Sequence, residues 1–105
     1  MRLVTRLGLS ALVALAMVGN WWLFYGAVWM DETNHALFGV LLFLLLGSRS
    51  IYVVPIAAIG WEAWELWRYP VAAFTPGANC YQDDTVLDIL LPVLTVLLLD
   101  RLDQA

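Results

Sequence analysis

Apolar residues fill four stretches of the chain, and short clusters of charged and polar residues separate these stretches. They cover residues 7–29, 36–47, 51–67 and 89–99. A straight helix needs about 20 residues to cross a hydrocarbon core of about 30 Å, so the second and fourth helices must begin earlier, near Asp31 and Asp84. The pattern therefore predicts helices over 4–29, 31–47, 51–69 and 84–101. We expect an all-α fold with a single domain over 1–105, in which these helices form an up-and-down four-helix transmembrane bundle.

The composition supports a membrane environment. Hydrophobic residues make up 63% of the chain and charged residues only 13%, whereas a soluble domain has about 25% charged residues. A chain of 105 residues is too small to hide so much apolar surface in its own core. The lipid bilayer is therefore the expected partner, and a net charge of −4 argues against nucleic acid as a second one.

The arginines indicate an orientation. In an up-and-down path, Arg2, Arg6, Arg49 and Arg101 fall on one side of the membrane, and only Arg68 falls on the other. The positive-inside rule then places both termini in the cytoplasm. Residues 1–16 also resemble a cleavable signal peptide, but the apolar run continues beyond them without a polar segment. We expect a retained first helix, and cleavage is the alternative.

Ionisable residues occur in pairs near the outer ends of three predicted helices. Each pair is spaced i, i+3 or i, i+4 and so projects from one helical face. The candidate ligand- or cation-binding residues are Asp31 and His35, Glu62 and Glu65, and Asp84 and Asp88. Glu62 is the most informative of them, because an ionisable side chain within hydrocarbon costs about 2.5–3.5 kcal/mol on insertion scales and usually marks a site.

These carboxylates cannot all stay charged and unpaired in a medium of low dielectric constant. Some must become protonated, pair with a base or hold a cation. An oxygen-rich set of this kind suits Mg²⁺, Ca²⁺ or Mn²⁺. The set is also compatible with acid/base chemistry, with Glu62 as the acid and His35 as base or ligand. Structural roles are the alternative: Asp31 and Asp84 as helix N-caps, His35 in a plain hydrogen bond, and Glu65 in an ion pair with Arg68.

Three short segments carry a resemblance to a known family. The first segment, residues 31–38, contains Asp31, His35 and Phe38. The second, residues 62–66, has the sequence EAWEL, and the third, residues 84–90, has the sequence DTVLDIL. Their order and helix placement resemble the VanZ-like family of small bacterial membrane proteins and a related group of glutamate-rich inner-membrane proteins. The resemblance covers about residues 31–99. It implies a multi-pass protein of the bacterial cytoplasmic membrane, with an outward polar site and a role at the cell envelope.

Three functions of different classes follow from these features. The first is an outward-facing site that binds a cation or the polar head group of an envelope lipid or glycan, with or without catalysis. The second is an accessory subunit, in which the acids pair with basic residues of a protein partner in the membrane. The third is a proton or cation carrier with Glu62 as its relay. The sequence leaves the ligand, any reaction and the oligomeric state open.

Overall fold

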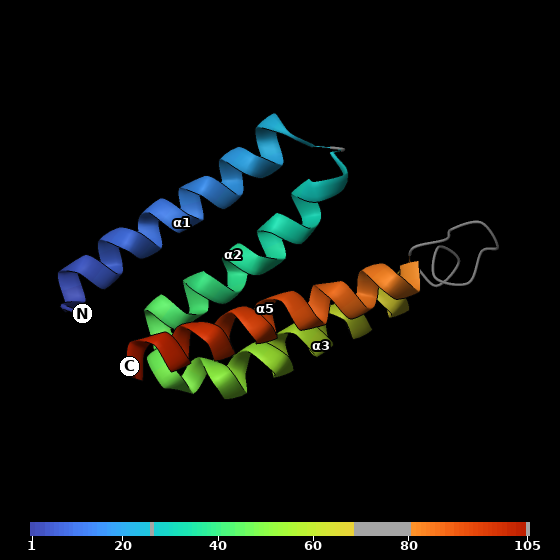
Figure 1. Ribbon diagram of the computed structural model, residues 1–105. Helices are drawn as coiled ribbons and strands as arrows, with labels where there is room; N and C mark the ends of the chain where they lie inside the picture. The colour runs from blue at the N-terminus through green and yellow to red at the C-terminus, as the bar shows by residue number, and fades with distance from the viewer. Residues whose placement is uncertain (26, 69–80, 105) are drawn as a thin grey trace.

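The computed structural model describes residues 1–25, 27–68 and 81–104, and at positions 28, 66 and 81–85 it describes the backbone only. The elements of these residues are the α-helices α1 (Leu3–Leu23), α2 (Val28–Leu46), α3 (Ser50–Arg68) and α5 (Tyr81–Gln104), and the short 3₁₀ helix η1 (Gly47–Arg49). No strand occurs in the described part of the chain (Figure 1). The all-α prediction is confirmed for these residues.

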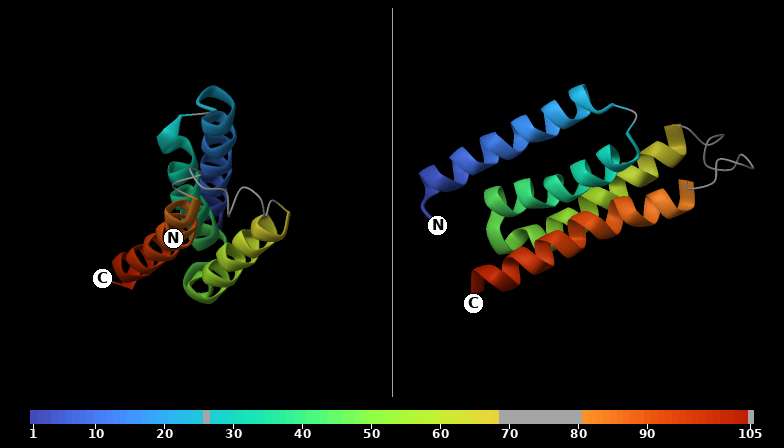
Figure 2. Two further views of the ribbon diagram at one scale, coloured as in Figure 1. Left: turned by 90° about the vertical axis from the view of Figure 1, so that its right-hand side faces the viewer. Right: turned by 45° about the horizontal axis from the view of Figure 1, so that its top comes forward.

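Successive helices run in opposite directions. Both termini and the turn between α2 and α3 lie at one end of the molecule, and the turn between α1 and α2 lies at the other (Figure 1). α2 packs against α1 and α5, and α5 also packs against α3. α1 packs mainly against α2, as the two views in Figure 2 show. α2 and α5 thus form the centre of the arrangement.

The first turn differs from the predicted boundary. α1 ends at Leu23 and not at residue 29. Its C-cap Phe24 donates the last helical N–H, to the carbonyl of Asn20 at 3.0 Å, but its backbone has left the helical conformation (φ −121°, ψ 24°). Ala27 is extended (φ −70°, ψ 137°) and is the N-cap of α2. The chain needs these non-helical residues to reverse its direction. Residue 29, predicted in the first helix, therefore belongs to the second.

The helix boundaries also show that two residues considered as N-caps do not cap their helices. Asp31 lies inside the first turn of α2, four residues after the N-cap Ala27, so it is not the N-cap residue. α5 begins at Tyr81, so Asp84 is already within that helix. α3 begins at Ser50, one residue before the predicted start. The predicted end at residue 69 lies outside the described residues.

A polar contact fastens α1 to α2 near the first turn. The side-chain amide of Asn20 donates to Asn34 Oδ1 at 2.9 Å and to the carbonyl of Met30 at 3.3 Å. Asn34 returns a hydrogen bond from its own amide to the carbonyl of Met17 at 3.2 Å. At the other end of the pair, Arg6 Nε donates to the carbonyl of Leu44 at 2.7 Å. The two helices are therefore held together at both ends by directional bonds.

The second turn is short and depends on glycine. Gly47 has φ +63°, a left-handed conformation that glycine adopts without steric cost. The fully buried Ser50 donates its hydroxyl to the carbonyl of Gly47 at 2.6 Å. Ser48 donates to Asp100 Oδ1 of α5 at 2.8 Å. These bonds fix α2, α3 and α5 at the end that carries both termini.

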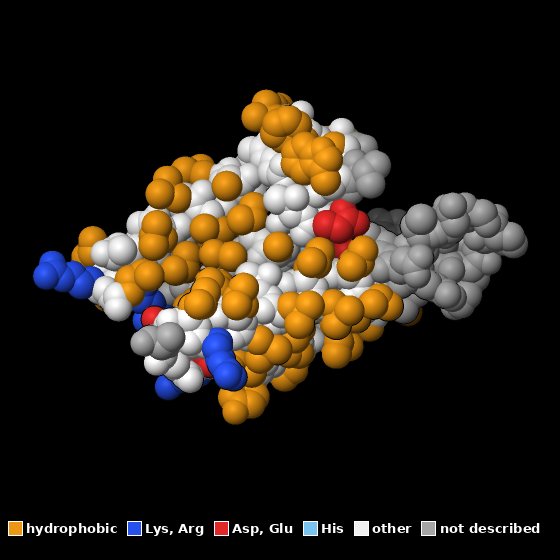
Figure 3. All heavy atoms as spheres, in the orientation of Figure 1, with side chains coloured by type: hydrophobic (Ala, Val, Ile, Leu, Met, Phe, Trp, Pro, Cys, Tyr) orange, Lys and Arg blue, Asp and Glu red, His pale blue; other side chains and the backbone are white. Residues whose placement is uncertain are grey.

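Much of the apolar surface is not buried within the chain. Leu12, Ile56 and Leu98, on three different helices, are 62%, 74% and 59% exposed. Apolar side chains cover most of the face in Figure 3, and arginine gathers at the end that holds the termini. By length and composition, two helical segments of the described chain can cross a bilayer, Leu3–Leu23 and Trp29–Glu65, the second of which includes α2 and most of α3. The first lies near the N-terminus, where a signal sequence has the same character.

Candidate functional site

A cavity of about 490 Å³ lies between the helices, and its acidic lining residues belong to the helix ends opposite the termini. All four α-helices of the described chain contribute to its lining. The predicted site residues that line it are Asp31, His35, Glu62, Glu65 and Asp88. The side chain of the sixth, Asp84, lies outside the described residues. Segments that are far apart in the sequence therefore bring four carboxylates and one imidazole to a single cavity.

The helical spacing explains how each pair reaches the cavity. Asp31 and His35 are one turn apart on α2, and Glu62 and Glu65 are one turn apart on α3, so each pair shares a face. Asp88 lies on α5, one turn before Pro92. α2 and α3 both pack against α5. Asp88 is consequently positioned between the two pairs.

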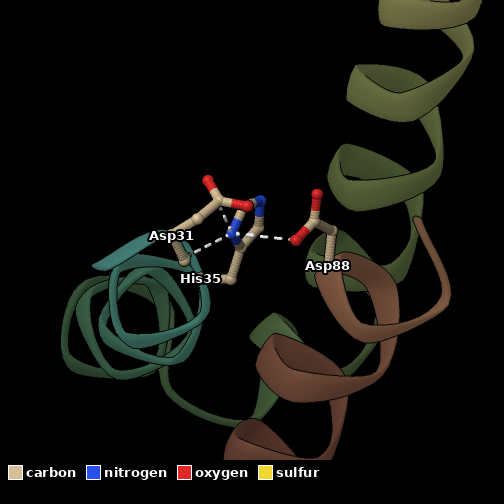
Figure 4. A group of neighbouring side chains, drawn as sticks. All are labelled: Asp31, His35 and Asp88. Atoms are coloured by element: carbon tan, nitrogen blue, oxygen red, sulfur yellow. Dashed lines mark hydrogen bonds and ion pairs between the residues drawn. The ribbon is translucent and has the colours of Figure 1, made fainter. Parts of the chain in front are cut away.

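The imidazole of His35 connects α2 with α5. Its Nδ1 lies 3.2 Å from Asp88 Oδ1 and 3.7 Å from Asp31 Oδ1. Figure 4 shows the three side chains directed toward one another. Nδ1 also lies 2.7 Å from the backbone carbonyl of Asp31. Since a carbonyl only accepts hydrogen bonds, Nδ1 carries the proton, and in the neutral ring the lone pair is on Nε2.

Glu62 is the most deeply buried acid of α3. Its side chain lines the cavity and is 3% exposed, and its Oε1 has no hydrogen-bond partner among the described residues. Burying a charged oxygen without a partner is expensive, and a bound cation or proton would remove that cost. The geometry therefore identifies an oxygen that can accept a ligand from the cavity.

Glu65 is less buried than Glu62 and accepts a hydrogen bond from a tryptophan. Trp61 donates its indole N–H to Glu65 Oε1 at 2.7 Å, and Trp61 itself lines the cavity. The ring of Trp61 also lies 5.2 Å from that of Trp64, centroid to centroid. Trp61 thus orients a carboxylate in the cavity lining, in addition to presenting an apolar surface.

The donor atoms fall into two sets that are close enough to coordinate metal ions. Asp31, His35 and Asp88 form one set, and Glu62, Glu65 and Asp88 form the other. Within each set, one donor atom from each residue lies within 4.8 Å of the others. Carboxylate oxygens dominate both sets, which favours Mg²⁺, Ca²⁺ or Mn²⁺ over zinc, because zinc sites in proteins rely on histidine and cysteine.

The inner part of the cavity is apolar. Phe38 lies one turn beyond His35 on α2, Ala58 lies one turn before Glu62 on α3, and Pro92 lies one turn beyond Asp88 on α5. Along the helices, the lining therefore changes from acidic toward the end opposite the termini to apolar one turn nearer the middle of the molecule.

Sequence reasoning missed Asn34, which lines the cavity and also bonds to Asn20 on α1. Asn34 is three residues after Asp31 and next to His35, so its position on the polar face was a usable signal. Trp61 was likewise not among the predicted site residues. Its contact with Glu65 follows from an i, i+4 spacing that sequence alone can suggest.

Comparison with known proteins does not assign a family: no family model, curated protein or solved structure matches this chain. The resemblance to the VanZ-like family therefore stays a prediction that depends on three short motifs.

Proposed function

We propose that the protein is a multi-pass protein of the bacterial cytoplasmic membrane whose acidic cavity faces away from the cytoplasm and binds a divalent cation. The observation that carries this proposal is the buried carboxylate of Glu62. Its oxygen has no hydrogen-bond partner in the described chain, and it belongs to a set of close donors with Glu65 and Asp88. Three acids so close together repel one another unless a positive charge lies between them.

The membrane location is supported by composition and by exposed apolar surface. The orientation is supported by the arginines: Arg2, Arg6, Arg49 and Arg101 belong to the end of the chain path that carries the termini and the α2–α3 turn. The acidic cavity lies toward the opposite end. A cavity with this orientation would exchange ions with the outer side of the membrane.

The charges of the lining favour a cation over internal pairing. Among the described residues that line the cavity, His35 is the only basic side chain, and it faces four carboxylates. One imidazole cannot neutralise four acids even when it is protonated. A hard divalent ion prefers oxygen donors and compensates two of these negative charges, so it suits the chemistry of the site better than an internal base does.

A second candidate is the polar head group of an amphipathic ligand, in keeping with an envelope role. The lining favours it, because the acids lie toward the end opposite the termini, whereas Phe38, Ala58 and Pro92 lie one turn nearer the middle of the molecule. A lipid of the outer leaflet has the same polarity, with its head outward and its chain inward. In this case a cationic head group would take the place of the metal ion.

The replacement Glu62→Gln tests the proposal. It keeps the size of the side chain and removes the charge, so the thermal midpoint of the protein in detergent should stay equal or rise. Mg²⁺, Ca²⁺ or Mn²⁺ should raise the midpoint of the wild type, because an ion that binds only the folded state adds about 2.7 kcal/mol of stability at 100 times its Kd. This ion-dependent rise should disappear in Glu62→Gln.

Glu32→Gln is the matched control. Glu32 also has a buried oxygen without a hydrogen-bond partner in the described chain, but it does not line the cavity. Its variant should keep the full response to the ions. If Glu62→Gln instead aggregates or fails to accumulate, the carboxylate holds a partner or the helices together, which supports the accessory-subunit function. Stabilisation of the chelator-treated wild type by added lipid alone would favour the head-group ligand.

A further inference from the structure

We infer that the cavity holds two divalent cations, and that the carboxylate of Asp88 bridges them. This inference rests on the proposed function and extends it from a single ion to a paired centre. It starts from the position of Asp88, which is the one residue common to both sets of donors.

The spacing of the donors separates two ion positions. Oxygen donors bind Mg²⁺, Mn²⁺ or Ca²⁺ at about 2.0–2.6 Å, so the ligands of one ion lie within about 4–5 Å of one another. The donors meet this limit as two sets of three residues, each within 4.8 Å. Asp31 and His35 of α2 belong to the first set, whereas Glu62 and Glu65 of α3 belong to the second. Each set thus joins a different helix to α5.

Asp88 has the geometry of a bridging ligand. It is 3% exposed, and it belongs to the donor set with Asp31 and His35 on α2. The same side chain also belongs to the donor set with Glu62 and Glu65 on α3. A carboxylate has two oxygens, so it can give one to each ion.

Two further donor atoms have local bonding that leaves a lone pair available for a metal ion. His35 Nδ1 is engaged by the carbonyl of Asp31, which leaves Nε2 with the lone pair that a cation needs. Glu62 Oε1 is buried, lines the cavity and has no hydrogen-bond partner among the described residues. Each set therefore holds one donor whose local bonding favours a ligand in the cavity.

The charge balance also favours two ions over one. Asp31, Glu62, Glu65 and Asp88 carry four negative charges when ionised. One divalent cation would leave two of these charges in a largely buried site, whereas two cations neutralise all four. Uncompensated charge is costly at low dielectric constant, so full occupancy by two ions is the electrostatically favoured state.

Mn²⁺ is a suitable probe of the paired centre. The amount of bound Mn²⁺ gives the number of ions per chain, and coupling between their electron spins shows whether two ions lie close together. The purified full-length protein in detergent is equilibrated with Mn²⁺, bound metal is counted, and the low-temperature paramagnetic resonance spectrum is recorded. We expect two Mn²⁺ ions per chain and a spectrum with spin coupling between them. Asp31→Asn should leave one bound ion and an uncoupled spectrum. Asp31 is half exposed, so the variant should fold, and His35→Gln provides a second variant with the same expected result.

Glu32→Gln is again the control and should bind two coupled ions. A wild-type protein that binds a single Mn²⁺, unaffected by Asp31→Asn, overturns the paired centre but leaves the proposed cation site standing. Two ions without spin coupling contradict the bridge. A wild-type protein that binds no Mn²⁺ overturns the proposed function itself, so the two failures are distinguishable.

Discussion

Polar residues inside the apolar helices are of two kinds. Asn20 and Asn34 have hydrogen-bond partners across the α1–α2 contact, so their polarity is satisfied by structure alone. Glu62 has a buried oxygen for which the described chain provides no such partner. This difference separates residues whose polar groups are satisfied within the fold from a residue whose carboxylate is not. Sequence alone could identify both as polar positions in an apolar run, but it could not distinguish them, because the distinction depends on what lies opposite on another helix.

The first kind gives a residue-scale prediction. Asn34→Leu removes the bond with Asn20 and the bond to the carbonyl of Met17. Because interhelical hydrogen bonds contribute about 0.6 kcal/mol each in membranes and an unpaired buried group adds about 1–3 kcal/mol, the stability should fall by about 1–3 kcal/mol. The thermal midpoint in detergent should decrease accordingly.

Thr33→Val is the neighbouring control. Thr33 is exposed and donates its hydroxyl only within its own helix, to the carbonyl of Trp29. Its replacement should leave the midpoint almost unchanged. Equal midpoints for the two variants would show that the contact between α1 and α2 does not depend on Asn34.

At the scale of the elements, the close approach of α2 to α5 positions the site. A Cβ atom added at Gly39 would lie 2.8 Å from the carbonyl oxygen of Pro92 and 3.0 Å from its Cα. Both of these are backbone atoms, so the helices must move apart to admit any side chain. The absence of a side chain at Gly39 therefore sets the separation of the helices, one turn inward from His35 and Asp88.

Gly39→Ala should therefore weaken the fold and the site together. Overpacking costs about 1–3 kcal/mol, and it should also reduce the stabilisation by Mn²⁺ as His35 moves away from Asp88. Gly60→Ala on α3 is the control, because its Cβ would meet nothing within 4 Å, and alanine favours a helix by about 1 kcal/mol over glycine. A Gly39→Ala protein with the stability and ion response of Gly60→Ala would contradict this role of the helix contact.

The elements show where sequence reasoning succeeds and where it stops. Apolar periodicity and length predicted each helix, because these are local properties of the chain. The first turn was misplaced, since residues 24–29 are as apolar as the helices beside them. The helix end in this stretch is set by the turn that reverses the direction of the chain, and the turn leaves no polar signal in the sequence. The close approach at Gly39 depends on α5, which is more than fifty residues away in sequence, and no local pattern encodes it.

At the scale of the whole molecule, the convergence of the acids was predictable, but their grouping was not. The alternation of helix directions brings the start of α2, the end of α3 and the start of α5 to one side, which is why five of the six predicted residues line one cavity. Which acids are neighbours depends on how each helix is rotated and on which helices touch. The central place of α5 makes Asp88 common to both donor sets, and this follows from packing alone.

The most direct test of the central claim is an X-ray structure of the protein crystallised with Mn²⁺, with data collected at the manganese absorption edge. We predict anomalous density in the cavity, about 2.1–2.5 Å from carboxylate oxygens of Glu62, Glu65 and Asp88. Well-ordered carboxylates in the cavity without anomalous density between them would contradict the claim that these acids bind a divalent cation.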